Sequence, residues 1–85
     1  MWYIYILRCV DGTFYTGITN NLEKRIQTHN TSDKLGAKYT RMHRPVTLVY
    51  TETCNNRSEA TKREHAIKRF SRSKKLVLIA SGTHI

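Results

Sequence analysis

Apolar and aromatic residues form a nearly continuous run near the start of the chain, WYIYILRC over residues 2–9. Apolar side chains fill both alternating positions, a pattern typical of a strand that is covered on both faces of its sheet. The dipeptide Asp11-Gly12 is a strong hairpin signal, and TFYTGI over residues 13–18 returns as a second strand. The pattern therefore predicts a β-hairpin with a buried first strand.

A helical pattern follows the hairpin. Asn20 or Asn21 caps this helix, which runs to about His29. With Asn20 as the cap, Glu23 comes three residues later, the spacing of a capping box.

The second half of the chain predicts a loop, a strand and two helices. Residues 30–45 are mostly polar and include a glycine and a proline, which indicates a loop with one helical turn. VTLVYTET over residues 46–53 is rich in β-formers and predicts a third strand. A cap-and-glutamate spacing opens a helix over about 57–70, and a last helix runs from about Ser73 to the stop at Gly82. This order predicts an α+β fold with a small three-stranded, mainly antiparallel sheet flanked by helices.

Composition adds a strong charge to this picture. The 85 residues fit one domain, expected over residues 1–80 with a short tail over 81–85. Fifteen Lys and Arg against six Asp and Glu give a net charge of +9, which favours a nucleic-acid partner. The alternative is a basic domain whose charges are only solvated.

The cysteines and the first residues indicate a cytoplasmic protein. Cys9 and Cys54 lack the spacing of a zinc site or a disulfide framework, and Cys9 is expected as a buried, reduced thiol. The apolar run before Arg8 is too short for a signal peptide or a membrane span.

Two polar residues border the apolar face of the first helix. Arg25 and His29 are four residues apart, so they share a face, and both adjoin the stripe of Leu22 and Ile26. A partly buried guanidinium needs an anion. That anion is either an intramolecular carboxylate, with His29 bonded to a backbone carbonyl, or a bound ligand.

Glu64 has the opposite sign on a similar border. It follows Ala60 by four residues and precedes Ile67 by three. Glu23 and Glu59 have the spacing of capping-box residues, whereas Glu64 has no such local structural role. It is a candidate metal ligand; the alternatives are a partner for Arg25 or an exposed charge beside Lys68.

The hairpin contributes two tyrosines, Tyr5 and Tyr15. A two-residue turn would place them on opposite faces of the sheet. A three-residue turn with Gly12 left-handed in a G1 bulge places Leu7 opposite Tyr15 and both hydroxyls on one face, and we expect this arrangement. Taken alone, both tyrosines also suit a packed core.

These residues together resemble the GIY-YIG nuclease domain, and in particular its small stand-alone bacterial members. The resemblance rests on YIYIL, on YTG, on a helix with Arg-x-x-x-His-Asn and on the later inward Glu, and it covers about residues 1–78. The family's Gly-Ile-Tyr stands here as Tyr3-Ile4-Tyr5 and its Tyr-Ile-Gly as Tyr15-Thr16-Gly17. The first glycine is therefore missing, whereas both tyrosines and the structural Gly17 remain.

The resemblance implies a phosphodiesterase site with one divalent metal ion, Mg²⁺ or Mn²⁺, held by Glu64. It implies that Arg25 pairs the phosphate oxygens, that Tyr5 takes a proton from the attacking water and that Tyr15 orients water or phosphate. His29 relays the proton or holds the phosphate. Because an ordinary phenol is a weak base at neutral pH, we expect the cations of the site to lower the pKa of Tyr5.

Basic residues outside this site are candidates for binding nucleic acid, although a solvated basic face is equally compatible with them. One group lies between residues 63 and 75 and consists of Arg63, Lys68, Arg69, Arg72, Lys74 and Lys75. Lys38, Tyr39 and Arg41 form a second, basic-aromatic group, in which Tyr39 suits stacking on an unpaired base.

The resulting prediction is a monomeric, structure-directed or non-specific DNA endonuclease with a role in repair or processing. DNA is expected in preference to RNA, and single-stranded or branched forms suit Tyr39. No specificity domain is present in this sequence, so a protein partner is a further source of targeting. The competing hypothesis is a non-catalytic basic module that binds nucleic acid; a ribosome-associated protein would explain the charge but not Glu64.

Overall fold

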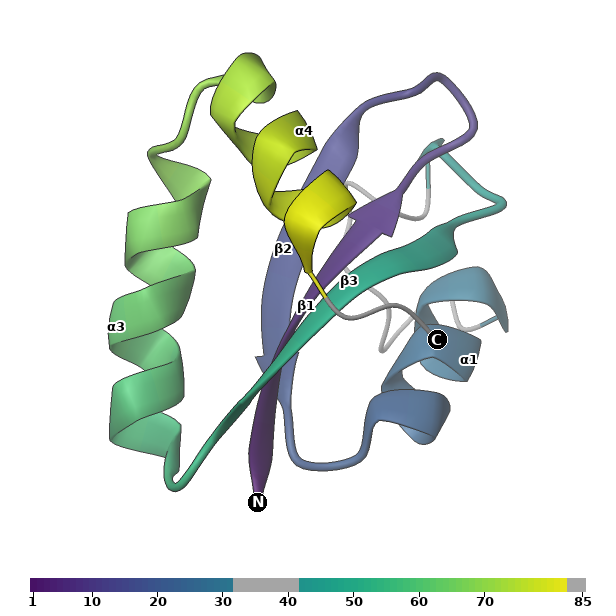
Figure 1. The fold of residues 1–85 in the computed structure, drawn as a ribbon. Helices are drawn as coiled ribbons and strands as arrows, with labels where there is room; N and C mark the ends of the chain where they lie inside the picture. Colours follow the sequence, from purple (N-terminus) through teal and green to yellow (C-terminus); the bar gives the residue numbers. More distant parts are fainter. Residues whose placement is uncertain (32–41, 83–85) are drawn as a thin grey trace.

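Three antiparallel strands form one sheet in the order β2-β1-β3 (Figure 1). The computed structural model describes residues 1–31 and 42–82 of the chain. Its elements are β1 (Trp2–Arg8), β2 (Phe14–Thr19), α1 (Leu22–Thr31), β3 (Thr47–Cys54), α3 (Arg57–Lys68) and α4 (Arg72–Ser81). The expected α+β class and antiparallel sheet are confirmed.

The central strand β1 is buried on both faces, as its composition predicts. Ile4 and Ile6 pack with Ala60 and Ile67 under α3 and α4, and all four are fully buried. Tyr5 and its neighbours on the opposite face pack against α1. Figure 1 shows α1 on one side of the sheet and α3 with α4 on the other. The sheet therefore separates two small apolar layers.

The hairpin has the predicted three-residue turn. The Cys9 amide donates to the Thr13 carbonyl at 2.8 Å, and Gly12 adopts φ = 84°, a conformation that favours glycine. Leu7 lies opposite Tyr15 in the sheet register. Because side chains alternate along a strand, this register brings Tyr5 and Tyr15 to the same face.

Asn21, one of the two predicted caps, begins α1, and the last helix begins one residue before the predicted Ser73. The Asn21 side chain accepts the backbone N–H of Lys24 at 3.2 Å, so Asn21 is the cap of α1. Lys24 rather than Glu23 then occupies the capping-box position. The last helix begins at Arg72 because Ser71 caps it.

Both cysteines are free thiols, and Cys9 is buried as expected. No helix within residues 1–31 and 42–82 is long and apolar enough to cross a membrane.

Candidate active site

Tyr5 and His29 meet on the α1 side of the sheet. The Tyr5 hydroxyl lies 2.9 Å from Nε2 of His29, and this hydrogen bond is buried. Tyr15 completes an aromatic cluster, with its ring centroid 5.2 Å from that of His29 and 6.5 Å from that of Tyr5. The structure thus brings together three of the residues that the sequence marks as candidates.

The absence of a side chain at Gly17 leaves room for the Tyr5 ring. Gly17 lies opposite Tyr5 in the β1–β2 register. A Cβ at position 17 would lie 2.6 Å from Cζ of Tyr5 and closer still to its hydroxyl oxygen. The glycine is required for space, because its backbone does not adopt a positive φ.

We therefore expect Gly17→Ala to destabilise the fold by about 1–3 kcal/mol, the usual cost of overpacking a filled site. In a Tyr5→Ala background the same change should cost nothing or stabilise, because the clash is gone and alanine suits a strand better than glycine. Urea unfolding of the four proteins in this double-mutant cycle measures the coupling. Additive free energies of unfolding would show that Gly17 does not accommodate the Tyr5 ring.

Burial sets the ionisation of this pair. It raises the pKa of Tyr5 to about 12, although a hydrogen bond from Arg25 acts in the lowering direction. Burial, with the charges of Arg25 and Arg44, lowers the pKa of His29 to about 4. The expectation that cations lower the pKa of Tyr5 is therefore wrong for the ligand-free protein, because desolvation of the phenolate outweighs them. His29 is neutral at pH 7, so it is not one of those cations.

The neutral state of His29 makes stability depend on pH. The pKa of His29 is 6.5 in an ordinary environment and about 4 here, so between these values the unfolded chain binds more protons. The free energy of unfolding should therefore fall by roughly 3 kcal/mol as pH drops through this window. His29→Gln should remove this component, as measured by urea unfolding at pH 4.5 and pH 7. An equal pH dependence in both proteins would contradict the assignment.

Arg25 lies half-buried on α1, beside both members of the pair. Its guanidinium is a hydrogen-bond donor to Tyr5, and its charge acts on the pKa of His29. The tautomer of His29 decides which partner donates in the Tyr5–His29 hydrogen bond. The site thus holds a fixed cation next to a phenol and a neutral imidazole.

Glu64 lies on α3, on the opposite side of the sheet from α1 and next to the edge strand β2 (Figure 1). Its charge is near enough to contribute to raising the pKa of Tyr5. Its side chain is 16% exposed and pairs with Lys68 of the next helical turn, with 3.6 Å between Oε2 and Nζ. The structure thus pairs Glu64 with Lys68 rather than with Arg25 among the residues it describes.

Two residues that the sequence analysis did not assign to the site fix the end of α1. Asn30 accepts the Val46 amide at 2.9 Å and donates to the Val46 carbonyl at 3.2 Å. Arg44 donates to the His29 carbonyl. These bonds hold the helix carrying His29 against the start of β3. The only sequence signal for Asn30 is its place directly after His29.

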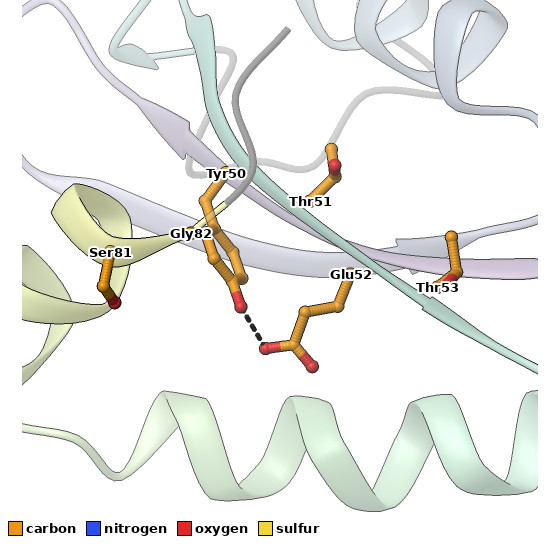
Figure 2. A pocket seen from close by; sticks show the side chains of 6 residues that line it. All are labelled: Tyr50, Thr51, Glu52, Thr53, Ser81 and Gly82. Carbon is orange, nitrogen blue, oxygen red and sulfur yellow. Dashed lines mark hydrogen bonds between the residues drawn. The ribbon is translucent and has the colours of Figure 1, made fainter.

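One predicted nucleic-acid contact also has a role in the fold. Arg63 donates to Glu52 with both Nε and Nη2, at 2.9 Å each, and the same carboxylate accepts the Tyr50 hydroxyl. Figure 2 shows Tyr50 and Glu52 meeting in a hollow between β3 and the end of α4. Arg63 thus has an intramolecular partner, and its contact with nucleic acid stays a prediction.

Two further basic residues are partly engaged. Arg72 lies over the Phe14 ring at 4.9 Å and donates to the Gly12 carbonyl at 2.9 Å. The Lys74 ammonium lies 4.2 Å from the centre of the Phe70 ring. Exposed basic side chains remain at Lys68 and Arg69 on α3, whereas that of Lys75 is half-buried. The predicted contacts Lys38, Tyr39 and Arg41 lie outside the described residues.

Comparison with known proteins places this geometry in context. A family model described as the GIY-YIG catalytic domain matches residues 1–76. The chain is 59% identical over 81 residues to a UPF0213 protein of Desulfotalea psychrophila. The aligned region covers 95% of this chain and 73% of that protein. The chain is 56% identical over 80 residues to a UPF0213 protein of Staphylococcus saprophyticus, covering 94% and 95% respectively.

Two solved structures have the same fold. A solution NMR structure of a protein from E. faecalis has a TM-score of 0.61 at 42% identity and covers 98% of this chain and 90% of that one. The solution NMR structure of a UPF0213 protein from Bacillus halodurans has a TM-score of 0.59, also at 42% identity, and covers 94% and 84%.

Proposed function

Because this chain belongs to the GIY-YIG catalytic domain family, we propose that it is an endonuclease that hydrolyses phosphodiester bonds of DNA with one divalent metal ion. The observation that carries the proposal is the buried Tyr5–His29 hydrogen bond, with Arg25 beside it. A neutral imidazole that accepts a phenol proton next to a fixed cation is the arrangement expected of a proton acceptor beside an anionic phosphate.

Tyr5 and His29 act together as the general base. As a water oxygen attacks the phosphorus, its proton passes to the Tyr5 oxygen while the Tyr5 proton passes to Nε2 of His29. No phenolate accumulates, so the raised pKa of Tyr5 is no obstacle. The entering phosphodiester anion raises the pKa of His29 from its low value, since a nearby negative charge favours the imidazolium.

Arg25 binds the phosphate and thereby uncovers the hydroxyl oxygen of Tyr5, the general base. In the ligand-free protein its guanidinium donates to Tyr5, and the Tyr5 side chain is 1% exposed. A non-bridging phosphate oxygen is a stronger acceptor than a neutral phenol, so the guanidinium turns to it when DNA binds. This movement stabilises the developing charge and leaves the phenol oxygen accessible to water.

Glu64 is the residue that would hold the metal ion. No three His, Cys, Asp or Glu gather around a common point in the described part of the chain, so an all-protein cage of the zinc type does not fit. One partly exposed carboxylate does fit Mg²⁺ or Mn²⁺, which keep several waters and take further oxygens from a phosphate. When bound, the ion supplies Lewis-acid stabilisation of the leaving oxygen. Lys68 neutralises Glu64 until then.

The substrate contacts begin beside Glu64 and continue along the exposed face of α3. Lys68 lies next to the Glu64 carboxylate, and Arg69 follows at the end of the helix. Such contacts bind the DNA backbone without selecting a sequence. We propose cleavage directed by DNA structure, with single-stranded or branched DNA preferred and a role in DNA repair or processing.

We expect the double change Lys68→Ala/Arg69→Ala to weaken DNA binding and to reduce the slope of log K against log salt by about 1.4. Arg63→Ala should leave this slope unchanged while lowering stability, since its partner is Glu52. Fluorescence polarisation with a labelled single strand, over a series of salt concentrations, measures both. A slope reduced by Arg63→Ala and not by the double change would reverse the assignment.

The proposed activity is tested by incubating the protein with end-labelled single-stranded, duplex and flapped DNA in Mg²⁺, Mn²⁺ or EDTA. We expect cleavage in both metals and none in EDTA. Salt-sensitive binding without cleavage in any of them would instead favour the second candidate, a non-catalytic nucleic-acid-binding module.

A further inference from the structure

A second concave surface lies on the face of the sheet opposite Tyr5 and His29. It is a groove of about 220 Å³ between the hairpin end of the sheet and α4. The groove is lined by Arg8, Phe14, Val49, Arg72, Leu76 and Ile79. None of these residues is part of the proposed active site.

The walls of the groove are mainly apolar. On α4, Arg72, Leu76 and Ile79 recur at spacings of four and three residues and so form one stripe. Leu76 lines the groove and is 45% exposed to solvent. On the sheet, Arg8 and Phe14 are paired opposite each other across β1 and β2. Each wall thus carries one arginine and two apolar side chains.

Two arginines line the groove, one on each wall. Among the described residues, no acidic side chain lines it. Asp11 is paired with His43 at 3.3 Å, and Glu52 is held by Arg63. Positive charge on both walls, with no carboxylate in the lining, favours an anionic group in the groove.

The neighbouring contacts disfavour a nucleobase as the occupant. Stacking would need an open aromatic face, but the guanidinium of Arg72 already covers Phe14 at 4.9 Å. The apolar side chains of the lining offer no hydrogen-bond donors to the charged oxygens of a phosphodiester backbone. An apolar side chain flanked by carboxylates satisfies both parts of the groove.

We propose that this groove binds an acidic peptide segment of a partner protein, with one large apolar side chain between Leu76 and Val49 and carboxylates on Arg8 and Arg72. A partner bound here leaves the Tyr5–His29 face open, because the sheet lies between them. Such a partner can contribute to target choice from outside the proposed active site. The inference does not depend on the proposed nuclease activity.

The test uses a fluorescein-labelled acidic dodecapeptide that carries one leucine and one phenylalanine among glutamates. The reference peptide has serine at these two positions and the same charge. We expect the parent protein to prefer the apolar peptide by about tenfold or more, the factor for burying one large apolar side chain. Arg8→Glu and Leu76→Asp should each remove most of this preference, whereas Lys24→Glu, the same charge change on α1, should preserve it.

Two further measurements accompany the binding curves. Arg8→Glu should melt at the same temperature as the parent, because Arg8 is exposed at the end of β1, and this shows that lost binding is not lost folding. Cleavage of bare DNA by this variant should equal that of the parent, so a failure of this inference is distinguishable from a failure of the proposed nuclease.

Three results would overturn the proposal. Equal affinity for the two peptides, or binding weakened equally by Arg8→Glu and Lys24→Glu, would mean that only the net charge of +9 attracts them. Weaker binding of a single-stranded oligonucleotide to Leu76→Asp and Arg8→Glu would assign the groove to nucleic acid. A dimer of the parent in light scattering that Leu76→Asp dissociates would assign it to a second copy of the chain.

Discussion

Glu64→Gln is expected to reduce metal-dependent DNA cleavage by about a thousandfold or more. The change keeps the size of the side chain and removes the charge that holds the divalent ion. Loss of this ion removes several kcal/mol of transition-state stabilisation, and about 4 kcal/mol corresponds to a thousandfold. Single-turnover cleavage with protein in excess over labelled DNA measures the effect without interference from product release.

Glu59→Gln is the matched control for Glu64→Gln. Glu59 lies on the same helix, is exposed and accepts the Asn55 amide at 3.3 Å, a role that glutamine also performs. Its cleavage rate should equal that of the parent. Cleavage lost equally in both variants would mean that α3, and not the carboxylate at position 64, is responsible. Full activity of Glu64→Gln would refute the metal assignment.

Tyr5→Phe is expected to slow cleavage by about 10²–10⁴-fold, the range for removing a general base. The change deletes one oxygen and leaves the buried ring in place, so the fold is kept. If Tyr5 and His29 form one relay, adding His29→Gln to Tyr5→Phe should cost little more than Tyr5→Phe alone. Rates of the two single variants and the double variant therefore test the relay itself.

Tyr3→Phe is the control for this series, because Tyr3 lies two residues earlier in the same strand and has no role in the proposed site. It should cleave like the parent. Independent, multiplicative effects of Tyr5→Phe and His29→Gln would show that the two residues act separately. In that case the 2.9 Å hydrogen bond would be structural only.

The hairpin shows how far local sequence determines this site. Asp11-Gly12 and the two flanking apolar runs predict a left-handed Gly12, and from that turn follows the register of Leu7 opposite Tyr15. The side-chain alternation of strands then places both tyrosine hydroxyls on one face. The position of His29 followed in the same way from helical spacing with Arg25.

The ionisation of the site was beyond sequence analysis. The pKa values of Tyr5 and His29 depend on how completely α1 and the sheet exclude water, and burial is a property of the whole fold. The role of Arg63 was missed for a similar reason. Its partner Glu52 comes from a strand eleven residues earlier, and no local spacing relates a residue of β3 to one of α3.

Glu64 is proposed to hold a single divalent ion at the Tyr5–His29 site when DNA is bound. Electron paramagnetic resonance of Mn²⁺ detects this ion, with a phosphorothioate oligonucleotide that resists cleavage, for the parent, Glu64→Gln and Glu59→Gln. We predict one bound Mn²⁺ per chain in the parent and in Glu59→Gln, and none above the oligonucleotide background in Glu64→Gln. Mn²⁺ bound equally by all three proteins would exclude Glu64 as the metal ligand.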